Sequence, residues 1–118
     1  MTSQNLIDDF SESMLEAESI LASLGFAPHS FRAVGYAQFR QFKKGNMVVE
    51  FMFGPSEWQV EMLIETDDQT YALKDLLKIP LLQTWVTENK YIPPDRRNVR
   101  LEVLWFLDLV KVAVETIP

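Results

Sequence analysis

The chain has 118 residues, 47% of them hydrophobic and 24% charged, which is enough apolar material for a domain with its own core. It contains no cysteine, which excludes disulfide frameworks, thiolate metal sites and cysteine nucleophiles. The formal net charge of −6 opposes binding to the phosphate backbone of nucleic acids. We therefore expect one domain over residues 1–118 and no nucleic-acid partner.

The first predicted element is an amphipathic helix over residues 5–24. Its apolar residues recur at spacings of three and four, the period of one helix face: Ile7, Phe10, Met14, Ala17, Leu21 and Leu24. Gly25 can adopt the left-handed conformation that ends a helix, and Phe26 can then fold back on the last turn. The acidic start lacks the features of a signal peptide, and no apolar stretch could cross a bilayer. We therefore expect a cytoplasmic protein that binds no membrane.

Three strands are predicted next, in an antiparallel meander. They cover residues 31–42, 48–53 and 57–65, where apolar and polar side chains alternate with a period near two. If Phe39 and Phe51 both face the core, the first two strands must be joined by a three-residue loop. That loop, residues 44–46, places Arg40 opposite Glu50.

The register between the second and third strands is left open by the sequence. Pairing Phe53 with Trp58 would place Glu50 opposite Glu61, whereas pairing Phe51 with Trp58 would place Glu50 opposite Gln59. The first arrangement brings two like charges together, which disfavours it.

Short elements follow, and then a long helix. The pattern predicts a short fourth strand over residues 70–72, a helical turn over residues 73–77 and a short helix over residues 81–87. Asp95 is the predicted N-cap of a helix over residues 96–116. Its apolar stripe consists of Val99, Val103, Phe106, Val110, Ala113 and Ile117.

This last helix is more apolar than one stripe requires, because four leucines and Trp105 lie beside it in the sequence. Such a helix is either buried on two sides or packed against another chain. Alternation over residues 98–104 also fits a strand, but we favour the helix. The patterns together predict an α+β fold: an N-terminal amphipathic helix, an antiparallel three- to four-stranded meander, short helices, and a long C-terminal helix packed on one sheet face.

The sequence offers little for catalysis. His29 is the only histidine and no motif surrounds it, so a histidine-based metal site or a serine–histidine–aspartate triad has no support. The four glycines are scattered and do not form a phosphate-binding loop. Carboxylates on the polar face of a sheet stay solvated, which prevents one of them from acting as a general acid. We therefore expect no enzyme, no catalytic residue, no metal and no cofactor.

Two surfaces are candidates for binding. Polar, tyrosine and methionine side chains predicted to point away from the core form the first: Tyr36, Arg40, Glu50, Met52, Glu57, Glu61 and Glu65. The second is a contact between copies of the chain through the apolar C-terminal helix, at Leu101, Leu104 and Leu107.

The order of elements resembles a known group of proteins. A first helix ending in LASLGF, a meander, the phrase YALKDLLKIPLLQTW and a closing helix are similar to small acidic bacterial α+β proteins. Some of those are proposed to be immunity proteins that neutralise a cognate toxin. The resemblance implies a non-catalytic binding module with a protein partner, which the net charge suggests is basic, and it assigns no functional residue. A homo-oligomeric structural or regulatory protein and a small-molecule-binding domain are the alternatives.

Overall fold

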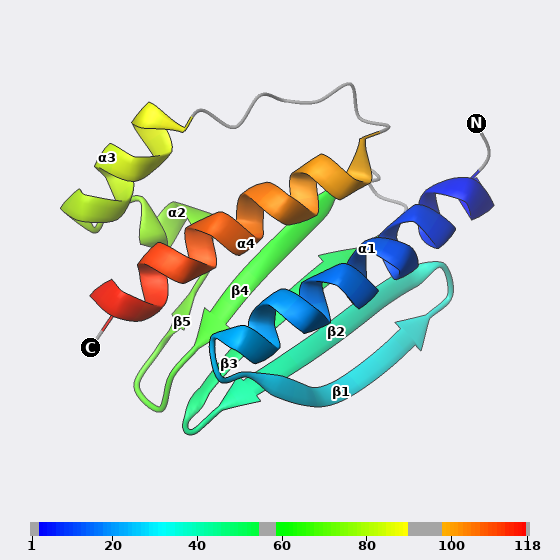
Figure 1. Cartoon of the computed structure of the whole chain (residues 1–118), viewed down its shortest axis with the longest axis horizontal. Helices are drawn as coiled ribbons and strands as arrows, with labels where there is room; N and C mark the ends of the chain where they lie inside the picture. Colours follow the sequence, from blue (N-terminus) through cyan, green and yellow to red (C-terminus); the bar gives the residue numbers. More distant parts are fainter. Residues whose placement is uncertain (1–2, 55–58, 90–97, 118) are drawn as a thin grey trace.

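The computed structural model describes residues 3–54, 59–89 and 98–117. In the first helix, the side chains are described from residue 6 onward. The elements are α1 (Ser3–Ser23), β1 (Ala27–Val34), β2 (Ala37–Lys44), β3 (Met47–Phe53), β4 (Val60–Glu65), β5 (Thr70–Tyr71), α2 (Leu73–Leu76), α3 (Pro80–Glu88) and α4 (Val99–Thr116). The five strands form one antiparallel sheet in chain order, and α1 and α4 lie side by side on one of its faces (Figure 1). The predicted α+β fold is confirmed.

The first helix ends as its sequence predicts. Gly25 has a φ of +94°, and its N–H donates to the carbonyl oxygen of Ala22 at 3.0 Å. The N–H of Phe26 donates to the carbonyl oxygen of Leu21 at 2.9 Å, which completes a Schellman motif, and the Phe26 ring is buried. The predicted stripe from Ile7 to Leu21 is buried against the sheet and α4.

The sheet has five strands, which is more than the three to four predicted. The difference arises because residues 31–42, predicted as one strand, are divided between β1 and β2. β1 ends at Val34, Gly35 and Tyr36 form the turn, and β2 begins at Ala37 opposite Val34. Gly35 has a φ of +60°, which suits a tight hairpin turn. His29 lies at a bulge in β1 and is exposed, so it belongs to a strand and not to the predicted connection.

The register predicted between residues 31–42 and residues 48–53, which now concerns β2 and β3, is wrong by one residue. Lys44 pairs with Met47, so the turn contains two residues, Gly45 and Asn46, instead of three. Arg40 consequently lies opposite Phe51, on the face that the helices cover, and Glu50 lies opposite Gln41. Because a shift of one residue moves every side chain to the other face, Phe39 points away from the core.

The register between β3 and β4 also differs from both predicted alternatives. Phe53 pairs with Val60, Phe51 with Met62, and Glu50 with Leu63. The alternation itself is confirmed, because the residues of one parity are buried: Val49, Phe51, Phe53, Val60, Met62 and Ile64. Trp58, on which both alternatives depended, lies outside the described residues.

The C-terminal half follows the predicted order of short strand, helical turn, short helix and long helix. Residues 99–104 belong to α4, so the strand alternative is wrong there. Asn98 caps this helix by accepting a hydrogen bond from the N–H of Leu101 at 3.2 Å, and the predicted cap Asp95 lies outside the described residues.

The additional apolar surface of α4 is mostly buried within the chain. The predicted stripe is buried, and Leu107 and Leu109 are buried with it. Trp105 packs on Trp85 of α3, with ring centroids 5.6 Å apart. The helix therefore contacts the sheet, α1 and α3. It is buried on more than one side within the domain, which is the first of the two arrangements expected from its sequence.

Candidate functional site

The face of the sheet opposite α1 and α4 is called here the open face. On β2, β3 and β4 its side chains are Phe39, Gln41, Lys43, Val48, Glu50, Met52, Glu61, Leu63 and Glu65. Glu61 and Glu65 are exposed, while Glu50, Met52 and Leu63 are half-buried among their neighbours. The alternation of each strand places acidic and apolar side chains together on this face.

The strand register fixes which side chains are neighbours on the open face. Met52 lies directly across from Glu61, Leu63 across from Glu50, and Val48 across from Glu65. Directly opposed residues on one face have Cβ atoms about 4.5–5.5 Å apart. Two half-buried apolar side chains, Met52 and Leu63, are thus bordered by carboxylates over β3 and β4.

The charge of the open face changes sign towards β1. Lys43 on β2 lies across from Val48, and the Arg32 guanidinium on β1 lies 4.5 Å from the centroid of the Phe39 ring. The acidic part therefore covers β3 and β4 and the basic part covers β1 and β2. A partner that meets β3 and β4 encounters negative charge.

The structure brings together four of the seven predicted surface residues: Glu50, Met52, Glu61 and Glu65. Tyr36 is exposed but lies in the turn between β1 and β2. Glu57 lies outside the described residues. Leu63 and Val48 are members that the sequence reasoning did not select, although the same alternation that selected Glu61 and Glu50 includes them.

Arg40 is not part of the open face, which corrects its predicted place. It lies on the covered face, where its guanidinium carbon is 4.3 Å from the centroid of the Phe31 ring. Burial lowers the pKa of the Arg40 guanidinium below its usual value, and the Glu18 carboxylate of α1 opposes that shift. Its buried Nε makes no hydrogen bond with the part of the chain that the structure describes.

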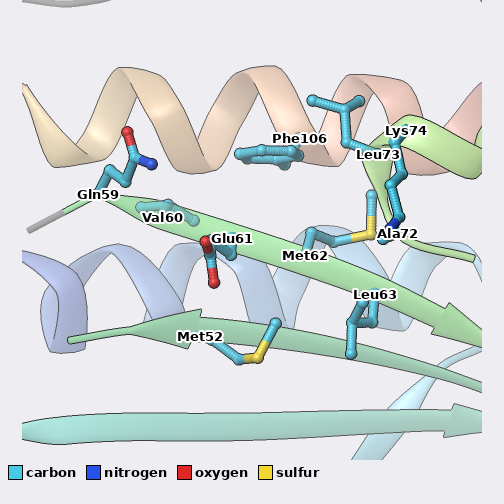
Figure 2. Close-up of a pocket in the computed structure, with 10 residues that line it drawn as sticks. All are labelled: Met52, Gln59, Val60, Glu61, Met62, Leu63, Ala72, Leu73, Lys74 and Phe106. Atoms are coloured by element: carbon cyan, nitrogen blue, oxygen red, sulfur yellow. The ribbon is translucent and has the colours of Figure 1, made fainter. Parts of the chain in front are cut away.

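A pocket of about 320 Å³ borders the open face at the outer side of β4, and it is called here the edge pocket. Its lining residues are Met52, Gln59, Val60, Glu61, Met62, Leu63, Ala72, Leu73, Lys74 and Phe106. Figure 2 shows β4 crossing the pocket, Phe106 approaching from α4, and Leu73 and Lys74 at the α2 end. Met52, Glu61 and Leu63 line the pocket and also belong to the open face.

The three leucines predicted to form a contact between copies of the chain through α4 differ in their exposure to solvent. Leu101 is 55% exposed, and Leu104 is half-buried against the core. Leu107 is 1% exposed, because it faces the interior of the domain, so it cannot take part in a surface contact. The sequence could not separate these leucines, since the helix is apolar on more than one side.

Two other features are absent from the described ranges. No group of three or more histidine, aspartate or glutamate side chains there could hold a metal ion. None of the helices in those ranges has the length and apolar character needed to cross a membrane.

Comparison with protein-family models, curated proteins and solved structures found no match to this chain.

Proposed function

We propose that this chain is a non-catalytic protein-binding module whose open face binds a basic partner protein in the cytoplasm. The observation that supports the proposal is the grouping of Glu50, Glu61 and Glu65 around Met52 and Leu63 on one face of β3 and β4. Within this class we propose inhibition of the partner, in the manner of an immunity protein. The net charge of −6 is consistent with a basic partner.

The two kinds of side chain have different parts in the proposed interaction. Met52 and Leu63 are half-buried in the free chain and lose their remaining contact with water when a partner covers them, which favours binding. The exposed carboxylates Glu61 and Glu65 attract a basic surface before contact, which raises the association rate more than the affinity.

The test is charge reversal on the open face. Glu50→Lys combined with Glu61→Lys should slow association with the purified partner by about tenfold or more at low salt, and the difference should shrink as salt rises. A matched control reverses Glu88 and Glu115, which are exposed on α3 and α4. An unchanged association rate in the open-face variant would remove the open face from the binding site.

A second candidate is self-association through the outer side of α4, which the 55% exposure of Leu101 favours. Light scattering of the wild-type chain and of Leu101→Glu tests it. A dimer that Leu101→Glu dissociates would support this candidate, and a wild-type monomer over the accessible concentrations would reject it.

A further inference from the structure

β1 is the end strand of the sheet on the α1 side (Figure 1). The strand order places β2 on one side of it and, among the described residues, no strand on the other. All eight residues of β1 are exposed, whereas β5, at the opposite end of the sheet, has only two residues. An unpaired strand edge presents N–H and C=O groups to which another strand can add.

The first half of this edge carries two features that hinder the addition of a strand. Pro28 lacks an N–H, and the ladder with β2 shifts between Pro28 and Ser30. Residues 30–34 lack both features and pair with β2 without a shift. Among them, Phe31 and Val34 are 56% and 59% exposed. The second half of β1 is therefore regular and exposed, as a strand that accepts a neighbour must be.

The register identifies the main-chain groups of β1 that point outwards. The residues on either side of a two-residue hairpin turn, here Val34 and Ala37, form a hydrogen-bonded pair. Such pairs alternate with non-bonded pairs along an antiparallel ladder, so Arg32 bonds to β2 while Phe31 and Ala33 do not. The N–H and C=O groups of Phe31 and Ala33 therefore point away from β2, towards the open side of the strand.

The two strands at this end of the sheet are basic, although the net charge of the chain is −6. Residues 27–34 and 37–44 contain no aspartate or glutamate, and their basic residues are Arg32, Arg40, Lys43 and Lys44. Arg32 and Lys43 are exposed on the open face. A strand added beside β1 would therefore meet positive charge on that face.

The α1 side of the same edge is apolar. Phe31 lies across from Arg40 on the side of the sheet that the helices cover, and the Arg40 guanidinium carbon lies 4.3 Å from the centroid of the Phe31 ring. The Glu18 carboxylate of α1 attracts this guanidinium, which offsets its charge. An added strand would therefore meet the exposed Phe31 ring on the α1 side.

We propose that an extended acidic segment of another protein adds to residues 30–34 of β1 as a sixth strand. The N–H and C=O groups of Phe31 and Ala33 bind its main chain, a carboxylate lies beside Arg32 on the open face, and an apolar side chain contacts Phe31 on the α1 side. Lys43 adds to the positive charge that attracts the segment. A second copy of the chain is disfavoured, because two β1 strands carry charge of the same sign. This inference is independent of the proposed function, which concerns the carboxylates of β3 and β4.

Peptides added to the full chain test the inference. One pool contains acetylated, amidated heptapeptides that alternate Asp or Glu with Val, Ile, Leu or Phe, and the matched pool has Lys or Arg in place of the acids. With the best acidic binder at about ten times its Kd, hydrogen exchange of the Phe31 and Ala33 amides should slow about tenfold. The basic pool should leave both amides unprotected, wherever else it binds.

Two variants test the assigned contacts. Arg32→Glu should weaken binding of the acidic peptide by about tenfold or more at low salt. The matched reversal Lys111→Glu, at an exposed position of α4, should leave the affinity within about twofold of wild type. Ala33→Pro removes an outward N–H that β2 does not use, so it should abolish binding and leave the chain folded.

A change in the peptide serves if Ala33→Pro does not fold. N-methylation of every second residue of the peptide should abolish binding in one frame and be tolerated in the other, because a strand turns alternate N–H groups towards its neighbour.

The inference is overturned if no acidic peptide binds at millimolar concentration, if Phe31 and Ala33 stay unprotected, if Arg32→Glu binds as the wild type does, or if both methylation frames are tolerated equally. Self-association in light scattering that Ala33→Pro abolishes would also overturn it, because a second copy would then occupy the edge. The Glu50 and Glu61 reversal tests the proposed function separately, so the failure of one leaves the other standing.

Discussion

The N–H of Val60 on β4 donates a hydrogen bond of 2.8 Å to the carboxylate of Glu102, which lies 42 residues later on α4. Glu102 is 2% exposed, so an ionisable side chain is buried where α4 meets β4. The contact supplies a side-chain acceptor for a main-chain donor of β4, outside the part of the strand that pairs with β5. The helix that completes the core therefore also binds the main chain of β4.

Replacing Glu102 should cost stability in a graded way. Glu102→Ala leaves the Val60 N–H without its acceptor and removes buried atoms, so we expect the free energy of unfolding to fall by about 2–4 kcal/mol. Glu102→Gln keeps an acceptor oxygen and should cost about 1 kcal/mol. Urea denaturation of both variants measures the difference, and an Ala variant as stable as the wild type would contradict it.

Two leucines of α4 should respond oppositely to the same substitution. Leu107→Glu places a carboxylate among buried apolar side chains, so we expect a loss of more than about 4 kcal/mol or an unfolded chain. Leu101→Glu alters an exposed position and should change the free energy of unfolding by no more than about 0.5 kcal/mol. Circular dichroism and urea denaturation measure the stability of both variants. A Leu107→Glu variant that is folded and as stable as the wild type would refute the assigned packing.

Arg40 should contribute little net stability despite its central position. Its pKa is lowered by burial, which means that the protein environment disfavours the charged form more than water does. Arg40→Met removes the desolvated charge and keeps contact with the Phe31 ring, so the free energy of unfolding should stay within about 1 kcal/mol of wild type or rise. Arg40→Glu should be clearly less stable, because the new carboxylate faces Glu18.

The direction of the Arg40 pKa shift also predicts its effect on pH dependence. A base whose pKa is lower in the folded state binds fewer protons there, so its contribution to stability rises with pH as the guanidinium titrates. That range is strongly alkaline, so between pH 5 and 8 the Arg40→Met variant and the wild type should show parallel stability curves. Divergence of the curves in that range would indicate another role for Arg40.

The end of α1 should depend on Gly25. Its φ of +94° is unfavourable for a side chain, and an added Cβ would lie 3.0 Å from Cε of Lys44. Lys44 in turn donates from Nζ to the carbonyl oxygen of Leu24 at 2.9 Å, at the end of the helix. Gly25→Ala should therefore lower the free energy of unfolding by about 1–2 kcal/mol.

A control for Gly25 is available at the first hairpin. Gly35→Asn changes a glycine with a φ of +60° and open space around it, and asparagine tolerates this conformation. It should cost less than Gly25→Ala in the same thermal or urea denaturation experiment. Equal losses in the two variants would contradict the combined effect of backbone strain and contact with Lys44 assigned to Gly25.

Local signals made much of the fold predictable. The period of α1, the stop at Gly25 and Phe26, and the alternation of residues 48–53 act between near neighbours in the sequence, and the structure confirms each. The strand register was harder to predict from the sequence, because it depends on where each turn begins. Assigning both Phe39 and Phe51 to the core required a longer turn, whereas Phe39 instead lies on the open face beneath the Arg32 guanidinium.

The candidate site was predictable to a similar extent. Alternation alone placed Glu50, Met52, Glu61 and Glu65 on one face, because the side chains of a strand have a period of two. The edge pocket could not be predicted in the same way. It requires Phe106, Leu73 and Met62 to meet, and their meeting depends on how α4 and α2 pack beside β4.

The most direct measurement is site-specific photo-cross-linking in the native cell. A benzophenone side chain is placed at Glu65 on the open face, or at Glu115 on the exposed side of α4 as the control, and cross-linked products are identified by mass spectrometry. The proposed function predicts one basic protein cross-linked from position 65 and absent from position 115. A partner captured from position 115 alone, or only a second copy of the chain, would contradict it.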